Sequence, residues 1–204
     1  MRVEARGLGV RLGGRVVFAA LSFDWEGPGV IAVTGANGSG KTTLLKVVAG
    51  LLAPGRGSIA WHAGGRALKP REARAELGFV SPEIGLYEDL SARENLAFFA
   101  EARGLTWSDA ESDRWFARLG LAGRGDDRLA GYSSGMKQRV KLAFALMARP
   151  GLVLLDEPGS NLDEAGRALL AGLVEEAARD ALVVVATNDP AEAAWARSKV
   201  ELAA

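Results

Sequence analysis

The chain of 204 residues contains no cysteine and only one histidine, His62. The lack of cysteine excludes disulfides, thiolate metal sites and cysteine nucleophiles. Lys and Arg number 25, as do Asp and Glu, so no overall charge excess favours nucleic acid or an anionic membrane as the main partner. No apolar run approaches the roughly 18 to 20 residues that span a bilayer, and the first residues lack the apolar core of a signal peptide. These absences favour a cytoplasmic chain whose role at a membrane, if it has one, is peripheral.

A glycine-rich loop follows an apolar run at residues 30–33 and leads into a segment with helical character. Backbone N–H groups at the start of a helix bind phosphate, and glycines let the loop curl around the anion. In this pattern Lys41 reaches the β- and γ-phosphates and the Thr42 hydroxyl is a ligand of Mg²⁺. The competing interpretation is a plain glycine-rich turn. The loop predicts an ATP site built from Gly35, Ala36, Asn37, Gly38, Ser39, Gly40, Lys41, Thr42 and Thr43.

Two carboxylates, Asp156 and Glu157, end the apolar run at residues 152–155. Such a run without polar alternation suits a buried parallel strand. A bare pair of carboxylates there is costly unless a cation intervenes, and Mg²⁺ meets that need. Asp156 is then a metal ligand, and Glu157 orients and deprotonates the water that attacks the γ-phosphate. An acidic cap at the start of a helix is the alternative explanation.

The distribution of strand-like and helical segments predicts an α/β fold with a mainly parallel sheet. Residues 3–61 carry short β-type runs between glycine turns, residues 87–149 are helical in character, and strands alternate with a helix after residue 150. We expect one domain over residues 1–204. Its ATP-binding core comprises residues 1–86 and 150–204, and an α-helical subdomain occupies residues 87–149.

Two further motifs flank the Asp156 strand: residues 132–139 read Tyr-Ser-Ser-Gly-Met-Lys-Gln-Arg, and residues 160–163 read Ser-Asn-Leu-Asp. With the phosphate loop and the carboxylate pair, they resemble the ATP-binding subunits of ATP-binding cassette (ABC) transporters. The resemblance covers nearly the whole chain. It implies a P-loop NTPase (RecA-like) core, an N-terminal antiparallel β subdomain, and a signature motif in the helical subdomain.

The resemblance also implies partners and further site residues. Ser133 and Gly135 are expected to contact ATP bound to an opposite subunit, and Asp163 to join the nucleotide site. The working unit is then a homodimer, or a heterodimer with another ABC subunit, that sits on the inner face of the cell membrane. An integral membrane subunit is expected to dock on the helical subdomain and the loop at residues 81–90. Residues 15–23 and the short length look similar to the haem exporters of cytochrome c biogenesis, while the signature is also similar to that of other exporters.

Four features depart from the family pattern, and one lies in the signature, where Ser134 and Met136 stand in place of a common glycine and a common glutamine. Asn188 stands where a histidine usually contacts the γ-phosphate, so we expect active but slow hydrolysis. Pro82 aligns with the usual glutamine of the loop at residues 81–90, which leaves Glu83 as the nearest oxygen ligand for Mg²⁺ or, equally, as a solvated loop residue. Leu12 takes the place of the aromatic that stacks on adenine. Phe18 is a substitute candidate that could equally belong to the core.

These departures keep alternatives open. A degenerate subunit that binds ATP but scarcely hydrolyses it is the main one, although the presence of Glu157 argues against it. A soluble cassette ATPase of DNA repair or translation would normally show a coiled-coil insertion, a second cassette or a basic groove, and none is visible. A simple kinase would lack the signature motif.

Overall fold

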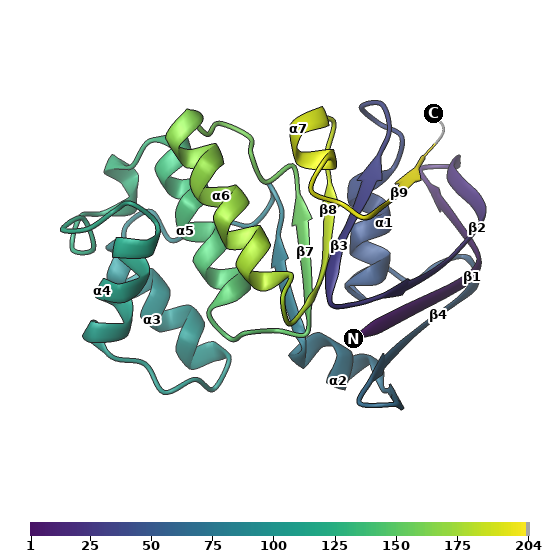
Figure 1. Cartoon of the computed structure of the whole chain (residues 1–204), viewed down its shortest axis with the longest axis horizontal. Helices are drawn as coiled ribbons and strands as arrows, with labels where there is room; N and C mark the ends of the chain where they lie inside the picture. Colours follow the sequence, from purple (N-terminus) through teal and green to yellow (C-terminus); the bar gives the residue numbers. More distant parts are fainter. Residues whose placement is uncertain (203–204) are drawn as a thin grey trace.

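A computed structural model describes residues 1–202 of the chain and shows two sheets with helices between and beside them (Figure 1). The parallel sheet has the strand order β6-β7-β8-β3-β9. It is formed by β3 (Gly29–Thr34), β6 (Leu77–Val80), β7 (Leu152–Asp156), β8 (Leu182–Ala186) and β9 (Ser198–Glu201). Every pair of neighbouring strands in it is parallel. The prediction of a mainly parallel sheet in an α/β fold is confirmed.

The second sheet is antiparallel and has the order β2-β1-β4-β5. Its strands are β1 (Arg2–Leu12), β2 (Arg15–Glu26), β4 (Arg56–Ala63) and β5 (Arg66–Leu68). Two of the short β-type runs expected within residues 3–61, at residues 16–18 and 21–23, belong to one long strand, β2. Ala20 lies within it at a φ of 56°, and the pairing with β1 is irregular nearby. His62 lies in β4 opposite Ala67, within the β4–β5 hairpin.

The helices fall into two groups. α1 (Lys41–Val48) lies between the two sheets, while α5 (Ser134–Leu146) and α6 (Glu164–Ala177) cover the other face of the parallel sheet (Figure 1). Outside them lie α3 (Ala92–Ala102) and α4 (Asp109–Arg118). The short helices are α2 (Pro70–Ala75), a 3₁₀ turn at Leu129–Gly131, and α7 (Pro190–Ala193). Within residues 1–202, no helix has both the length and the apolar character needed to cross a bilayer.

The central strands β7 and β8 are buried on both faces because each face has its own apolar core. Val153 and Leu155 of β7 pack with the helices α3 to α6, whereas Leu152 and Leu154 pack with α1 and the antiparallel sheet. This two-sided burial explains the unbroken apolar sequence of these strands. It also fixes the carboxyl ends of β3, β7 and β8 side by side, where the polar residues of the site follow.

Gly78 of β6 permits the close approach of α5 to the sheet. A Cβ atom at this position would lie 2.0 Å from the carbonyl oxygen of Ala145 and 2.9 Å from Pro150 Cγ. Both neighbours are held by the helix end and the following turn, so neither can move aside as a flexible side chain would. α5 carries the signature motif, and its distance from the sheet therefore depends on this glycine.

We expect Gly78→Ala to lower the free energy of unfolding by about 1 to 3 kcal/mol, because the added methyl overpacks the contact with α5. Denaturant unfolding of the two proteins measures this difference. Gly172→Ala is the matched control. Gly172 lies in the middle of α6 with open space around it, so this change should stabilise the chain by about 1 kcal/mol through helix propensity. Equal stabilities for the Gly78 variant and the wild type would contradict the packing argument.

Candidate active site

The glycine loop connects β3 to α1 and presents an uncapped helix start. Gly38 and Gly40 have φ angles of 82° and 98°, in the left-handed region that favours glycine. A Cβ at Gly40 would lie 2.5 Å from Val17 Cγ1 of β2, so the loop is packed tightly against the antiparallel sheet. No side chain caps the first turn of α1. Its N–H groups and the positive end of the helix dipole are thus available to an anion.

Lys41 is buried at the base of this loop, with only 6% of its surface exposed. Its ammonium donates hydrogen bonds to the carbonyl oxygens of Gly35 (2.9 Å) and Ala36 (3.4 Å) and to Asn188 Oδ1 (2.7 Å). Glu157 Oε1 lies 3.5 Å away. A buried cation needs such partners. The Lys41 ammonium therefore brings together residues that are far apart in the sequence, at 35–41, 157 and 188.

Asn188 follows β8 and joins Lys41 to the tip of the glycine loop. Its Oδ1 accepts from Lys41, while its Nδ2 donates to Asn37 Oδ1. The amide thus uses its acceptor and its donor at once. Asn188 stands in the place expected of a γ-phosphate contact, and its own side chain, an amide, does not ionise.

Asp156 and Thr42 form the second part of the site. Thr42 donates its hydroxyl hydrogen to Asp156 Oδ2 at 2.7 Å. Asp156 is 1% exposed, and its other oxygen, Oδ1, is buried without a hydrogen-bond partner. Burial raises the pKa of Asp156, and the charge of Glu157 acts in the same direction against the Thr42 hydrogen bond. A divalent cation would relieve this unpaired carboxylate.

The oxygens of Asp156 and Thr42 fit Mg²⁺ in particular. This ion prefers oxygen ligands, keeps several waters, and is typically held by one or two carboxylates together with substrate phosphates. Within residues 1–202 there is no cluster of three or more Asp, Glu, His or Cys side chains that would make a complete metal cage on its own. The pair is therefore suited to a metal that arrives with a phosphate.

Glu157 has a backbone conformation that is unusual for its residue type. Its φ is 47°, in the left-handed region, and its N–H donates to the carbonyl oxygen of Ala186 at 2.8 Å. Such backbone strain persists only where the surroundings enforce it, and it is common at functional sites. The turn leaves the side chain one-third exposed and directed toward Lys41. A partly solvated carboxylate beside a phosphate-binding lysine can orient and activate a water molecule.

Glu83 is held away from this cluster by a surface ion pair. Lys46 Nζ donates to both of its carboxylate oxygens, at 2.9 and 2.8 Å, and the Glu83 side chain is 67% exposed. Burial raises the pKa of Asp156, and the charge of the same lysine opposes that rise. Glu83 is thus paired with a cation of α1. The position of Lys46 in the sequence gave no indication of its ion pair with Glu83.

The signature residues lie at the beginning of α5 and adjoin the loop that follows β7. Ser133 caps α5 by accepting a hydrogen bond from the Met136 amide, and both Ser133 and Ser134 are exposed. A Cβ at Gly135 would lie 2.6 Å from the carbonyl oxygen of Asn161. Asp163 caps α6, because its Oδ1 accepts from the Gly166 amide at 2.8 Å. Ser133, Gly135 and Asp163 thus each have a structural role at the start of α5 or α6.

Gln138 connects α5 to the loop that follows β7. It is buried, and its Nε2 donates to the carbonyl oxygen of Pro158 at 2.9 Å. The motif at residues 132–139 contained Gln138, but the pattern did not single it out. A groove of about 630 Å³ opens beside this contact, lined among others by Pro82, Leu86 and Glu157.

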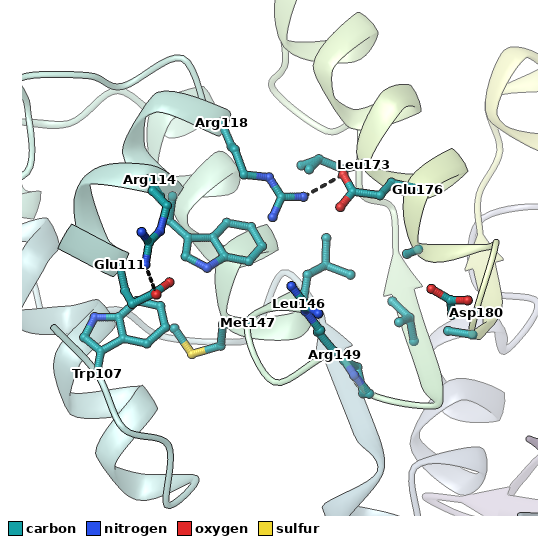
Figure 2. A pocket seen from close by; sticks show the side chains of 15 residues that line it. Trp107, Glu111, Arg114, Arg118, Leu146, Met147, Arg149, Leu173, Glu176 and Asp180 are labelled. Atoms are coloured by element: carbon teal, nitrogen blue, oxygen red, sulfur yellow. Dashed lines mark hydrogen bonds and ion pairs between the residues drawn. The ribbon is translucent and has the colours of Figure 1, made fainter. Parts of the chain in front are cut away.

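A second groove, of about 430 Å³, lies away from the glycine loop, near the amino end of β7 (Figure 2). It separates α4 and the end of α5 from α6. Figure 2 shows Arg118 reaching across it to Glu176, with a separation of 2.7 Å. The Arg118 guanidinium also lies 4.4 Å from the centre of the Trp115 ring. None of the predicted nucleotide ligands lines this groove.

Residues 18–160 match the protein family described as ABC transporter. The chain belongs to this family, as an ATP-binding and ATP-hydrolysing subunit of a membrane transporter. The resemblance inferred from the four motifs is confirmed, and the degenerate reading is not favoured.

Individual relatives carry a more specific name. The chain is 38% identical over 177 residues to the cytochrome c biogenesis ATP-binding export protein CcmA of Bradyrhizobium diazoefficiens, covering 86% of each protein. It is 35% identical over 189 residues to the protein of the same name from Cupriavidus pinatubonensis, covering 91% of this chain and 83% of the relative.

Solved structures agree on the fold. A putative ABC transporter ATP-binding protein from Pyrococcus furiosus superposes with a TM-score of 0.86 at 24% identity, over 99% of this chain and 98% of that one. An ATP-binding subunit of an ABC transporter superposes with a TM-score of 0.85 at 30% identity, over 99% and 86%.

We expect Asn188→His to raise kcat of ATP hydrolysis by about tenfold, well below the ~100-fold that full general acid–base catalysis can contribute. An imidazole can carry a proton near neutral pH, whereas the amide cannot. Steady-state ATPase assays measure this. Asn188→Gln, which keeps an uncharged amide, serves as control and should not raise the rate. An unchanged or lower rate for the histidine variant would count against the argument.

Proposed function

We propose that this chain is the ATPase subunit of an exporter, that it hydrolyses Mg²⁺-ATP as a dimer, and that it works on the cytoplasmic side of a membrane. The names of the relatives, which are export proteins of cytochrome c biogenesis, support the direction of transport. The observation that carries the proposal is the meeting of Lys41, Glu157, Asp156 and Thr42 at the carboxyl edge of one parallel sheet.

In this proposal each residue has a distinct task. The N–H groups of residues 35–43 bind the phosphates. Lys41 gives up some of its hydrogen bonds to carbonyl oxygens and binds the β- and γ-phosphate oxygens instead. Asp156 and Thr42 would hold Mg²⁺, which when bound neutralises the charge that develops on the phosphates. Glu157 orients the attacking water and takes its proton. Asn188 holds Lys41 from the other side and donates toward the γ-phosphate. Glu83, in this scheme, reaches the metal only if it leaves Lys46.

The beginning of α5 supports a dimer. Ser133 and Ser134 are exposed at a helix start, so the positive end of the α5 dipole faces outward from the chain. A phosphate held by a second subunit is a suitable partner for it. Gly135 brings this helix start against Asn161, so that Ser133, Gly135 and the loop ending at Asp163 would form one surface toward the other subunit. Homodimer and heterodimer both satisfy this geometry.

Lys41→Ala and Glu157→Gln are each expected to reduce ATP turnover by at least about a hundredfold, because they remove phosphate stabilisation and water activation. The wild-type rate should rise faster than linearly with protein concentration if the active form is a dimer. Steady-state hydrolysis over a range of protein concentration measures both effects.

Lys199→Ala and Glu175→Gln, at exposed positions, are the matched controls and should leave the rate unchanged. Tight ATP binding without turnover in the wild type would refute the proposed hydrolysis. A specific rate independent of protein concentration would refute the dimer.

For the membrane partner we propose a docking surface formed by Tyr87 and Phe98. Their side chains are 50% and 45% exposed, and the rings meet edge to face with 5.0 Å between centroids. Phe98 also packs on Phe99, which stacks on Phe144 of α5 at 4.1 Å. Exposed aromatics of this kind are typical of interface centres.

The surface is rigid because Asn95 fixes its base. Asn95 is fully buried, accepts from the Tyr87 amide and donates to the Tyr87 carbonyl oxygen, both at 2.9 Å. Leu86 and Glu88, beside Tyr87, line the groove that reaches Glu157. A cytoplasmic segment of the membrane subunit seated on Tyr87 and Phe98 would therefore adjoin the loop that carries the catalytic carboxylate.

We expect the double variant Tyr87→Ser, Phe98→Ser to reduce the ratio of membrane-bound to free chain in cells by about tenfold, equivalent to ~1.4 kcal/mol of binding. Its ATPase rate as an isolated chain should stay within about twofold of the wild type, since neither side chain touches the candidate site. Leu51→Ser, which alters another exposed apolar residue, is the control and should not change the distribution. An equal loss in both variants, or in neither, would overturn the docking surface.

A further inference from the structure

A buried glutamate outside the site described so far, Glu192, lies in the short helix α7. Only 5% of its surface is exposed, and its Oε2 is buried without a hydrogen-bond partner. Burial raises the pKa of Glu192, with further contributions from Asp189 and Glu157. Burying an ionisable group in this way is unfavourable. A position with only a packing role would be better filled by an apolar side chain.

The Glu192 carboxyl lies against the loop that follows the catalytic strand. A Cβ built on Gly159 would come within 2.0 Å of Glu192 Oε1 and 3.2 Å of its Cδ, so the side chain is seated on the backbone of this residue. The Gly159 amide and the Thr187 hydroxyl both favour its charged form through hydrogen bonding. One side chain thus contacts two segments that are separate in sequence.

Each of these segments carries a residue of the site. Gly159 comes two residues after Glu157, and Thr187 comes directly before Asn188. The Thr187 hydroxyl also accepts from the Asp189 amide at 2.9 Å, which fixes the turn at Asn188. Asn188 and Glu157 both contact the Lys41 ammonium, at 2.7 and 3.5 Å. Their spacing around Lys41 depends on how the two turns are held together.

We propose that Glu192 is a positioning residue for ATP hydrolysis, which fastens the Asn188 turn to the Gly159 backbone so that Asn188 and Glu157 face the same phosphate. This inference rests on the proposed function of the site. Arg167 supports the same arrangement from α6, because it pairs with Asp189 at 2.5 Å. The Arg167–Asp189 ion pair lies at the surface, whereas the Glu192 carboxyl is buried.

The test compares Glu192→Leu, which keeps the volume and removes the polar contacts, with Glu192→Gln, which keeps shape and hydrogen bonding. We expect the leucine variant to lower kcat by about tenfold or more, since small misplacements of reacting groups have effects of this size. Its ATP affinity should stay within about twofold of the wild type. The glutamine variant should retain at least about half of the rate. Glu175→Gln, exposed on α6, is the control.

A double-mutant cycle separates positioning from a general structural effect. If Glu192 acts through Asn188, Glu192→Leu should have little further effect on kcat in an Asn188→Ala background. Should the leucine variant fail to fold, Gly159→Ala crowds the same contact from the other side, and we expect it to lower kcat with ATP binding retained.

Three results would overturn the inference: a leucine variant with normal kcat, a loss of rate that only follows loss of ATP binding, or fully additive effects with Asn188→Ala. Each of these is compatible with a working wild-type ATPase. A wild type without turnover would instead refute the proposed function itself.

Discussion

The buried ammonium of Lys41 is the interaction on which the site depends. A cation with 6% exposure is stable only where oxygens surround it. Those oxygens come from the glycine loop, from Asn188 after β8 and from Glu157 after β7. Three strand ends are thereby held at one point.

The approach of the helices to this point is set by glycines and one buried carboxyl. Gly40 lets the loop lie on the antiparallel sheet, Gly135 lets α5 meet the loop after β7, and Gly159 receives Glu192. Side chains at these positions would separate elements that carry Lys41, Ser133 and Glu157. The residues of the candidate site are therefore arranged by close backbone contact across the molecule as well as by their own hydrogen bonds.

Sequence patterns predicted the parallel sheet and the order of its elements, because strands buried on both faces are apolar throughout and glycine loops mark the phosphate site. They also predicted that the Asp156 carboxylate would be costly to bury; in the structure its Oδ1 is buried without a hydrogen-bond partner. They could not show that β2 is continuous through Ala20, since the alanines there have weak strand preference. Nor could they find the ion pair between Lys46 and Glu83, or the burial of Glu192. Those features arise from contacts between residues that are distant in sequence, for which a single chain carries no periodic signal.

The ion pair between Arg118 and Glu176 spans the groove that separates α4 from α6, and both side chains are substantially exposed. Charges in such a setting are screened by dissolved salt, over a Debye length of about 8 Å at physiological ionic strength. Trp115 holds the arginine in place by its ring face, which salt affects less. The contact between α4 and α6 across this groove therefore weakens as the salt concentration rises, while Trp115 keeps the arginine in the same place.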